Sequence, residues 1–154
     1  MKRLLIVVEG DTEKEFIDKV LSPYLYAKGL QSVDCFKIKH TKGGLTKYQH
    51  IKTDLINCVY ENNVLVSTLI DFYALPKDFP KYEDAKKIVN KYERLSFLEK
   101  AIIEDVETEK GKSFPNLLPY IQLHEFEALV FSSIDAIRAL YSDQDAKFNE
   151  IEQV

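Results

Sequence analysis

Short apolar runs alternate along the chain with segments whose apolar residues recur every three or four positions. The first run, residues 4–8, is β-branched and ends at a glutamate and a glycine, which is typical of a buried strand followed by a tight turn. The next segment has capping-box spacing, with Thr12 followed three residues later by Glu15. We therefore expect a helix that begins near Thr12, is kinked or restarted at Pro23, and ends at Gly29.

The same alternation continues along the rest of the chain. Three further apolar runs predict strands at residues 32–38, 64–70 and 117–123. A second helix is expected to start at a capping box of Thr46 and Gln49, and a charged helical region over residues 82–109 follows the third strand. Pro119 indicates that the fourth strand lies near an edge of the sheet. This order predicts an α/β fold: a mainly parallel central sheet of about four strands, flanked by helices, in a single domain of residues 1–154.

Composition narrows the class of protein. The 154 residues, 45% of them hydrophobic, suffice for one domain with a real core. The net charge of -4 argues against a generally adhesive nucleic-acid or membrane binder, but it leaves room for a local basic patch. Cys35 and Cys58 lack metal-ligand spacing and stand in apolar surroundings, as buried thiols of a reduced compartment do. The apolar run before Glu9 is too short for a signal peptide and no run reaches membrane-spanning length, so we expect a cytoplasmic protein without membrane contact.

Acidic residues follow three of the predicted strands. Glu9 ends the first run, Asp71 ends the third, and Glu13 opens the first helix, where it can point back towards Glu9. The fourth run leads into His124, Glu125 and Glu127. Core packing does not explain these acids, whereas a ligand site at the carboxyl edge of a parallel sheet does. The alternative is that Glu13 only complements the helix dipole and that Glu9 is a solvated loop residue.

A carboxylate cluster of this kind, without cysteine or paired histidines, selects Mg²⁺ or Mn²⁺ over zinc. Two such ions about 3.5–4 Å apart would activate a water and stabilise the leaving oxygen of an in-line displacement. His124 would orient a ligand or serve as a general acid-base group, although a lone histidine beside a strand is more often a structural hydrogen-bonder.

One stretch of the chain is strongly basic. Residues 36–52 hold five lysines, two histidines and no acid, with two adjacent glycines in the middle. A flexible diglycine lets backbone N–H groups approach an anion closely, and lysines supply charge without demanding a fixed geometry. We therefore expect contacts to a phosphodiester backbone, with an ordinary solvated loop as the alternative. The candidate nucleic-acid-binding residues are Lys39, Lys42, Gly43, Gly44 and Lys47.

Three motifs, taken in order, carry a family resemblance: Glu-Gly-x-x-Glu after the first strand, Asp-x-Tyr after the third, and His-Glu-x-Glu-Ala-Leu-x-Phe after the fourth. Together they resemble the Toprim fold of the OLD-type nucleases, and more closely the uncharacterised Toprim-like proteins encoded beside ATPase genes in bacterial defence loci. The resemblance covers nearly the whole chain and implies a Toprim/Rossmann-like fold in which these acids hold divalent metal. The ligands so implied are Glu9, Glu13, Asp71 and Glu127, with Glu125 as an alternate or supporting member.

The chain departs from this pattern in two places. The usual Asp-x-Asp is Asp71-Phe72-Tyr73 here, which puts a phenol where a second carboxylate would stand. OLD-type enzymes also use a downstream lysine near the reacting phosphate, and only Lys147 is available before Val154. These departures leave two alternatives: a chain that is a C-terminally truncated piece of a longer protein, or a site whose activity is weak or lost.

The resemblance therefore predicts a nuclease that uses Mg²⁺ or Mn²⁺, acts on nucleic acid, with DNA ranked before RNA, and works with an ATPase partner in anti-phage defence. The residues expected to carry catalysis are Glu9, Asp71, Glu127 and His124. A second hypothesis is a non-catalytic regulatory or interaction subunit of an ATPase complex, which keeps the acids for metal-stabilised folding. A phosphatase or phosphotransferase with Asp71 as nucleophile ranks lowest, because the expected Ser/Thr and Lys signals are missing. The oligomeric state stays open, a homo-oligomer included.

Overall fold

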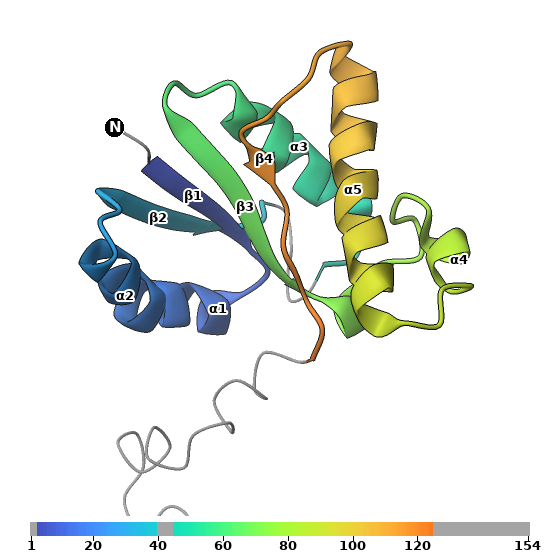
Figure 1. Cartoon of the computed structure of the whole chain (residues 1–154), viewed down its shortest axis with the longest axis horizontal. Helices are drawn as coiled ribbons and strands as arrows, with labels where there is room; N and C mark the ends of the chain where they lie inside the picture. Colours follow the sequence, from blue (N-terminus) through green and yellow to red (C-terminus); the bar gives the residue numbers. More distant parts are fainter. Residues whose placement is uncertain (1–2, 40–44, 125–154) are drawn as a thin grey trace, which may run out of the picture. The chain divides into compact units, whose positions relative to one another are not determined.

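The computed structural model describes residues 3–39 and 45–124. Contacts divide the chain into a compact unit, Met1–Leu123, and a second unit, His124–Val154, of which only His124 belongs to the described residues. Figure 1 shows the helices and strands of the first unit in colour.

Five strands, all parallel to their neighbours, form the central sheet (Figure 1). They are β1 (Arg3–Val8), β2 (Ser32–Lys37), β3 (Val64–Asp71), β4 (Leu117–Leu118) and β5 (Ile121–Gln122). The strand order is β2-β1-β3-β4, and β5 also pairs with β3. The predicted α/β fold with a parallel sheet is confirmed, and its arrangement is consistent with a Toprim/Rossmann-like fold. The count exceeds the expected four because the fourth predicted strand is divided in two.

The division lies at Pro119, which has no backbone N–H to donate to a neighbouring strand. The buried Thr68 side chain replaces the missing pairing: its hydroxyl accepts from the N–H of Tyr120 at 2.9 Å and donates to the Tyr120 carbonyl at 2.7 Å. The Glu99 carboxylate then accepts from the N–H of Ile121 at 3.0 Å, where β5 begins. Side chains of other elements thus hold the outermost strand through its break.

The first helical region is capped at Gly10. Helix α1 (Asp11–Phe16) continues through a π-helical turn, η1 (Ile17–Leu21), into α2 (Ser22–Ala27). No side chain caps the start of α1, so the predicted capping box of Thr12 and Glu15 is wrong. The π turn precedes Pro23, whose ring and missing N–H do not fit a regular helical interior. Gly29, with φ +92°, ends the region as predicted.

Helix α3 (Tyr48–Val59) obtains its cap from a distant residue. Its N-cap position makes no side-chain hydrogen bond, so the predicted capping box of Thr46 and Gln49 is wrong. Instead, the Asp78 carboxylate accepts from the N–H of Tyr48 at 3.1 and 3.3 Å. A carboxylate at this position also complements the partial positive charge of a helix N-terminus.

The charged region contains the short α4 (Tyr82–Ala85) and the long α5 (Lys91–Lys110) rather than one helix over residues 82–109. Asn90 starts α5, because its side-chain oxygen accepts from two N–H groups of the first turn at 2.9 and 3.3 Å. Gly111, with φ +60°, ends this helix in a left-handed conformation. Apolar periodicity predicts six inner positions in this region. Ile88 is only partly buried, and the other five are buried: Leu95, Leu98, Ala101, Ile102 and Val106.

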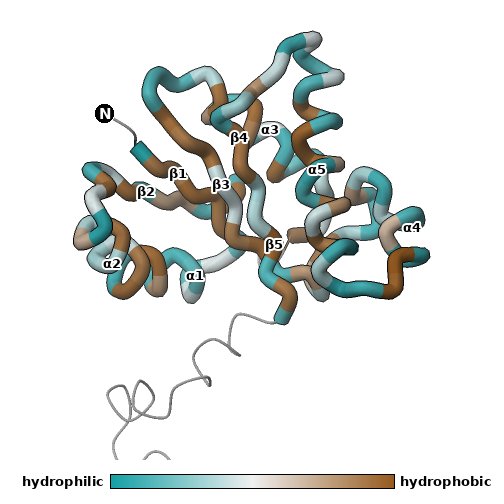
Figure 2. The backbone as a smooth tube through the Cα atoms, viewed as in Figure 1, coloured by the Kyte–Doolittle hydropathy of each residue, from teal (hydrophilic) through white to brown (hydrophobic). Residues whose placement is uncertain are grey.

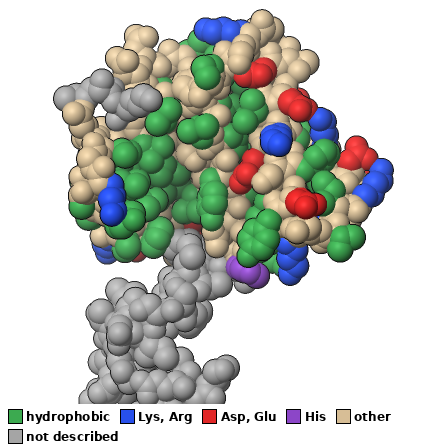
Figure 3. All heavy atoms as spheres, viewed as in Figure 1, with side chains coloured by type: hydrophobic (Ala, Val, Ile, Leu, Met, Phe, Trp, Pro, Cys, Tyr) green, Lys and Arg blue, Asp and Glu red, His purple; other side chains and the backbone are tan. Residues whose placement is uncertain are grey.

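Helices lie on both faces of the sheet, with α3 and α5 on one side and α1, η1 and α2 on the other (Figure 1). Alternate residues of β1 and β3 face the α3 side and join the main core, among them Leu5, Val7, Val64 and Val66. Figure 2 shows hydrophobic residues concentrated along the strands. On the other side, α1, η1 and α2 pack mainly against β2. In Figure 3, hydrophobic side chains also gather on the molecular surface between α1–α2 and α5.

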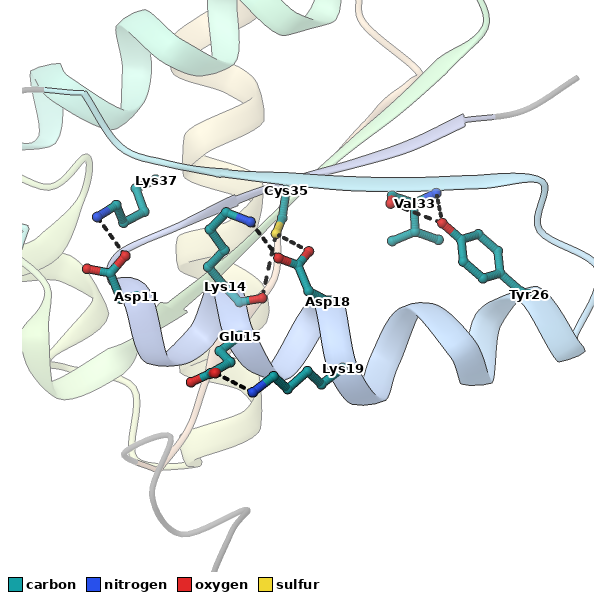
Figure 4. A network of polar contacts seen from close by, with 9 residues as sticks. All are labelled: Asp11, Lys14, Glu15, Asp18, Lys19, Tyr26, Val33, Cys35 and Lys37. Atoms are coloured by element: carbon teal, nitrogen blue, oxygen red, sulfur yellow. Dashed lines mark hydrogen bonds and ion pairs between the residues drawn. The ribbon is translucent and has the colours of Figure 1, made fainter. Parts of the chain in front are cut away.

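Polar contacts fix α1 and α2 against β2 (Figure 4). Lys37 of β2 forms an ion pair with Asp11 at 2.7 Å, and the Cys35 thiol lies 3.3 Å from the Asp18 carboxylate. The Tyr26 hydroxyl contacts the backbone of β2 at 3.3 Å. These contacts determine where the N-terminus of α1 stands relative to the carboxyl edge of the sheet.

Both cysteines are free thiols. Cys58 is buried, as predicted, whereas Cys35 is only partly buried. Burial raises the pKa of each thiol to about 11, so both are protonated and weakly nucleophilic at neutral pH.

Candidate metal and nucleic-acid site

The carboxyl ends of β1 and β3 lie next to each other at one edge of the sheet. Val8 pairs with Leu69, so Glu9 leaves β1 at the level where β3 reaches its last residue, Asp71. Because all strands are parallel, β2 and β5 also end at this edge. The structure therefore brings together the acid after the first strand and the acid at the end of the third.

Glu9 is half-buried and accepts hydrogen bonds from two distant parts of the backbone. Its Oε1 accepts from the N–H of Leu45 at 2.9 Å, and the N–H of Asp71 also hydrogen bonds to this carboxylate. Burial raises the pKa of Glu9 most strongly, and the nearby charge of Glu13 raises it further, while the two N–H groups lower it. The net pKa lies above the ordinary value for glutamate. A cation at this point would relieve both the burial cost and the repulsion from Glu13.

Glu13 lies in the first turn of α1, and its side chain folds back over Gly10. A Cβ atom on Gly10 would stand 2.9 Å from Glu13 Oε2, so the missing side chain leaves the room that this carboxylate occupies. Gly10 has an extended backbone with φ -135°, which any residue adopts. Glycine is therefore needed here for space and not for conformation.

The third predicted motif starts just beyond a strand that pairs with β3. Asp71 stands opposite Gln122 in the pairing of β3 with β5, and His124 follows two residues later with an exposed side chain. Glu125 and Glu127 lie outside the described residues. The edge therefore contains the first two motifs and the end of β5, the strand that precedes the third motif in the sequence.

The described part of the chain contains only some of the ligands that a metal ion would need. No three side chains of histidine, cysteine, aspartate or glutamate are grouped there closely enough to hold an ion. Glu9 and Glu13 do come close together, and Asp71 adjoins them through its backbone. Carboxylate oxygens of this kind suit Mg²⁺ or Mn²⁺ and not zinc. The described carboxylates are thus the right type of ligand for such an ion, but there are fewer than three of them in one group.

Backbone N–H groups on both sides of the basic segment donate to carboxylates. The N–H of Lys39 donates to the buried Asp54 carboxylate at 2.8 Å, which fixes the chain just after β2. The segment returns at Leu45, whose N–H donates to Glu9. The side chains of Lys39 and Lys47 are exposed. The other predicted nucleic-acid contacts lie outside the described residues: Lys42, Gly43 and Gly44.

Tyr73 stands where the sequence resemblance predicts a second aspartate. The residue is 59% exposed, and its ring packs edge-on against Phe72 with ring centroids 5.3 Å apart. The phenol therefore stands at the surface two residues after Asp71.

Two buried polar residues at this edge were not predicted from the sequence. Asp54 interrupts the apolar face of α3, and Gln122 ends an apolar strand; only 3% and 8% of their surfaces are exposed. The signal that could have found them is a polar residue at a position where helix or strand periodicity calls for an apolar one.

A family model described as "Domain of unknown function (DUF4276)" matches residues 8–154. The chain belongs to this family. The matched region of the DUF4276 domain begins at the end of β1 and contains every acid of the three motifs. No curated protein and no solved structure gives a significant match. In the described part of the DUF4276 chain, no helix is long and apolar enough to cross a membrane.

Proposed function

We propose that this DUF4276 domain is a metal-dependent nuclease of the Toprim type, related to the OLD-type nucleases, that hydrolyses phosphodiester bonds in nucleic acid, with DNA ranked before RNA as the substrate. It uses Mg²⁺ or Mn²⁺ and works in the cytoplasm with an ATPase partner in anti-phage defence. The observation that carries the proposal is the environment of Glu9, which accepts from Leu45 and Asp71 and experiences the charge of Glu13.

The ligands in this proposal are the acids at the carboxyl edge. Glu9, Glu13 and Asp71 hold the ion, together with Glu127 or Glu125. An ion held by these acids would supply Lewis-acid chemistry for the activation of water and the neutralisation of charge on the phosphate. His124 donates or accepts the proton of the leaving or attacking oxygen.

The basic segment positions the nucleic-acid backbone. Lys39 and Lys47 are exposed on either side of the segment, and the Leu45 N–H ties its return to Glu9 at 2.9 Å. This bond supports a single site in which lysines bind phosphates while neighbouring carboxylates hold the ion. A local cluster of cations serves this purpose even though the whole chain carries a net charge of -4.

A second candidate is a non-catalytic regulatory or interaction subunit of an ATPase complex. It is favoured by Tyr73, a phenol at the position where the resemblance predicts a second carboxylate. In this case, Glu9 and Glu13 bind an ion that stabilises the fold and take no part in cleavage.

The two candidates are separated by a cleavage assay with the full chain. Supercoiled plasmid, single-stranded DNA and RNA are incubated with Mn²⁺, with and without the ATPase encoded beside the gene. Glu9→Gln and Asp71→Asn remove one charge each from the site, and the matched controls Glu15→Gln and Asp84→Asn remove the same charge from exposed helical positions.

The nuclease proposal requires cleavage that depends on the ion, is lost in both site variants and persists in both controls. Cleavage that survives in Glu9→Gln would point to a contaminating nuclease or a different site. Metal binding without cleavage of any of the three substrates, with the ATPase present, would favour the regulatory subunit.

A further inference from the structure

Gln122 is a polar residue at a position where the fold buries its side chain. It is the last residue of β5, and only 8% of its surface is exposed. Burying a carboxamide is costly unless each of its polar groups finds a partner. An apolar residue would serve the packing of the strand equally well, so packing does not account for the amide.

The strand register places Gln122 beside Asp71. The two residues are paired in the parallel ladder of β3 and β5, as are their predecessors Ile70 and Ile121. Paired residues of parallel strands project to the same face, and successive residues project to opposite faces. Ile70 and Ile121 both join the core on the α3 side. Asp71 and Gln122 therefore share the other face, which is the side of α1 and Glu13.

One half of the Gln122 amide is held in place by a neighbour. The Tyr120 hydroxyl donates to Gln122 Oε1 at 2.6 Å, a short bond that occupies the carbonyl end. The amide nitrogen lies at the other end of the group and carries two N–H donors. Within residues 3–39 and 45–124, that nitrogen donates to no acceptor. In the described part of the chain this nitrogen is not one of the polar atoms that are fully buried without a partner, so it keeps contact with solvent and can donate to a ligand oxygen that arrives from there.

The face on which this donor lies can be reached from solvent. Leu118 and Tyr120 precede Gln122 at intervals of two residues along the same strand region. Their exposed fractions are 52% and 48%. Figure 3 shows uncovered hydrophobic side chains on the surface between α1–α2 and α5. Exposed side chains therefore border Gln122 on its own strand region.

We propose that the Gln122 amide donates a hydrogen bond to a phosphoryl oxygen of the substrate at the position next to Asp71, with Tyr120 holding the amide in the required orientation. This inference rests on the proposed function, because the phosphate is brought there by the ion that the acids bind. The site takes an oxyanion of a phosphodiester, since a neutral N–H donor binds an anionic oxygen more strongly than a neutral one.

The test uses the full chain and a fluorescent single-stranded DNA 12-mer, with binding measured by anisotropy in Ca²⁺. Mn²⁺ affinity is measured separately by calorimetry. Gln122→Leu removes the donors, and Tyr120→Phe removes only the hydroxyl that orients them. The matched controls are Gln49→Leu and Tyr92→Phe, which change exposed residues of α3 and α5.

Gln122→Leu should weaken oligonucleotide binding by about tenfold or more, because a hydrogen bond to a charged group is lost. Tyr120→Phe should weaken it by a smaller factor, and both variants should keep the Mn²⁺ affinity of the wild type within about twofold. The controls should bind as the wild type does. A merely structural role for Gln122 would lower the melting temperature without changing oligonucleotide affinity in the folded protein.

Three results would overturn the inference. If Gln122→Leu binds the oligonucleotide as tightly as the wild type does, the proposed contact is wrong and the nuclease proposal still stands. A loss of Mn²⁺ affinity in Gln122→Leu that accounts for all of the loss in oligonucleotide binding means that the amide supports the metal instead. A wild type that binds neither Mn²⁺ nor the oligonucleotide removes the proposed function and this inference together.

Discussion

Replacing Glu9 by glutamine tests the carboxylate site through stability alone. An ion that binds only the folded state stabilises it by RT ln(1 + [L]/Kd), which is about 2.7 kcal/mol at 100 times Kd. For a domain of this size the melting temperature changes by about 2–4 °C per kcal/mol, so Mn²⁺ should raise that of the wild type by roughly 5–11 °C. Glu9→Gln keeps an oxygen for the Leu45 N–H but lacks the charge, and it should lose this response.

Without metal, the same variant should be as stable as the wild type or more stable. Burial and the charge of Glu13 raise the pKa of Glu9 in the folded state, so the folded protein binds this proton more tightly than the unfolded chain does. Ionised Glu9 therefore destabilises the fold at neutral pH. The destabilisation decreases as the pH falls through the raised pKa, and it is gone below the ordinary glutamate value. The advantage of Glu9→Gln should disappear over the same acidic range.

Thermal unfolding followed by circular dichroism, at several pH values and from zero to millimolar Mn²⁺, measures both effects. Glu15→Gln is the matched control, since Glu15 is an exposed acid of α1 that pairs with Lys19. It should respond to Mn²⁺ as the wild type does. A wild type whose melting is indifferent to millimolar Mn²⁺, or a Glu9→Gln variant that responds fully, would refute the reasoning.

Three further outcomes test the basic segment and the scaffold. The first variant replaces three lysines by glutamate at once: Lys39, Lys42 and Lys47. This variant should bind every DNA sequence more weakly, and each lost phosphate contact should reduce the slope of log K against log salt by about 0.9 for duplex DNA; unchanged affinity would make the segment an ordinary solvated loop. Thr68→Val leaves the Tyr120 backbone without partners and should cost about 1–3 kcal/mol in urea unfolding, and a cost near zero would show that water replaces the hydroxyl. Asp78→Ala removes the cap from Tyr48 and should cost about 0.5–2 kcal/mol by the same measurement, whereas an unaffected helix would mean that the N–H finds water.

Much of the candidate site could be expected from the sequence, because core packing does not account for an acid at the end of a buried strand. Glu9 and Asp71 stand out in this way, and the structure places them at one edge of the sheet. The alternation of strands and helices predicts parallel strands, but only the structure shows that β1 lies between β2 and β3. Gln122 could not be assigned, because its importance depends on which residue stands opposite in a neighbouring strand.

The sequence by itself determined the elements that depend on local patterns. Apolar periodicity and turn residues predict the first three strands within one or two residues, and Gly29 ends the first helical region as expected. These signals are local because a helix or strand must present one face to the core regardless of what covers it. The same reasoning identifies five buried positions of α5 without knowledge of what they pack against.

The tertiary structure decided which distant groups complete these elements. Two predicted capping boxes are wrong, because Gly10 starts α1 without a side-chain cap and Asp78 supplies the acceptor for α3. The fourth strand is divided at Pro119, and the distant Thr68 supplies hydrogen bonds to the Tyr120 backbone there. Backbone groups accept whichever partner packing brings within reach, and residues far apart in sequence are chosen by strand register and helix packing. Local sequence therefore sets where an element can form, whereas its partners are set by the whole fold.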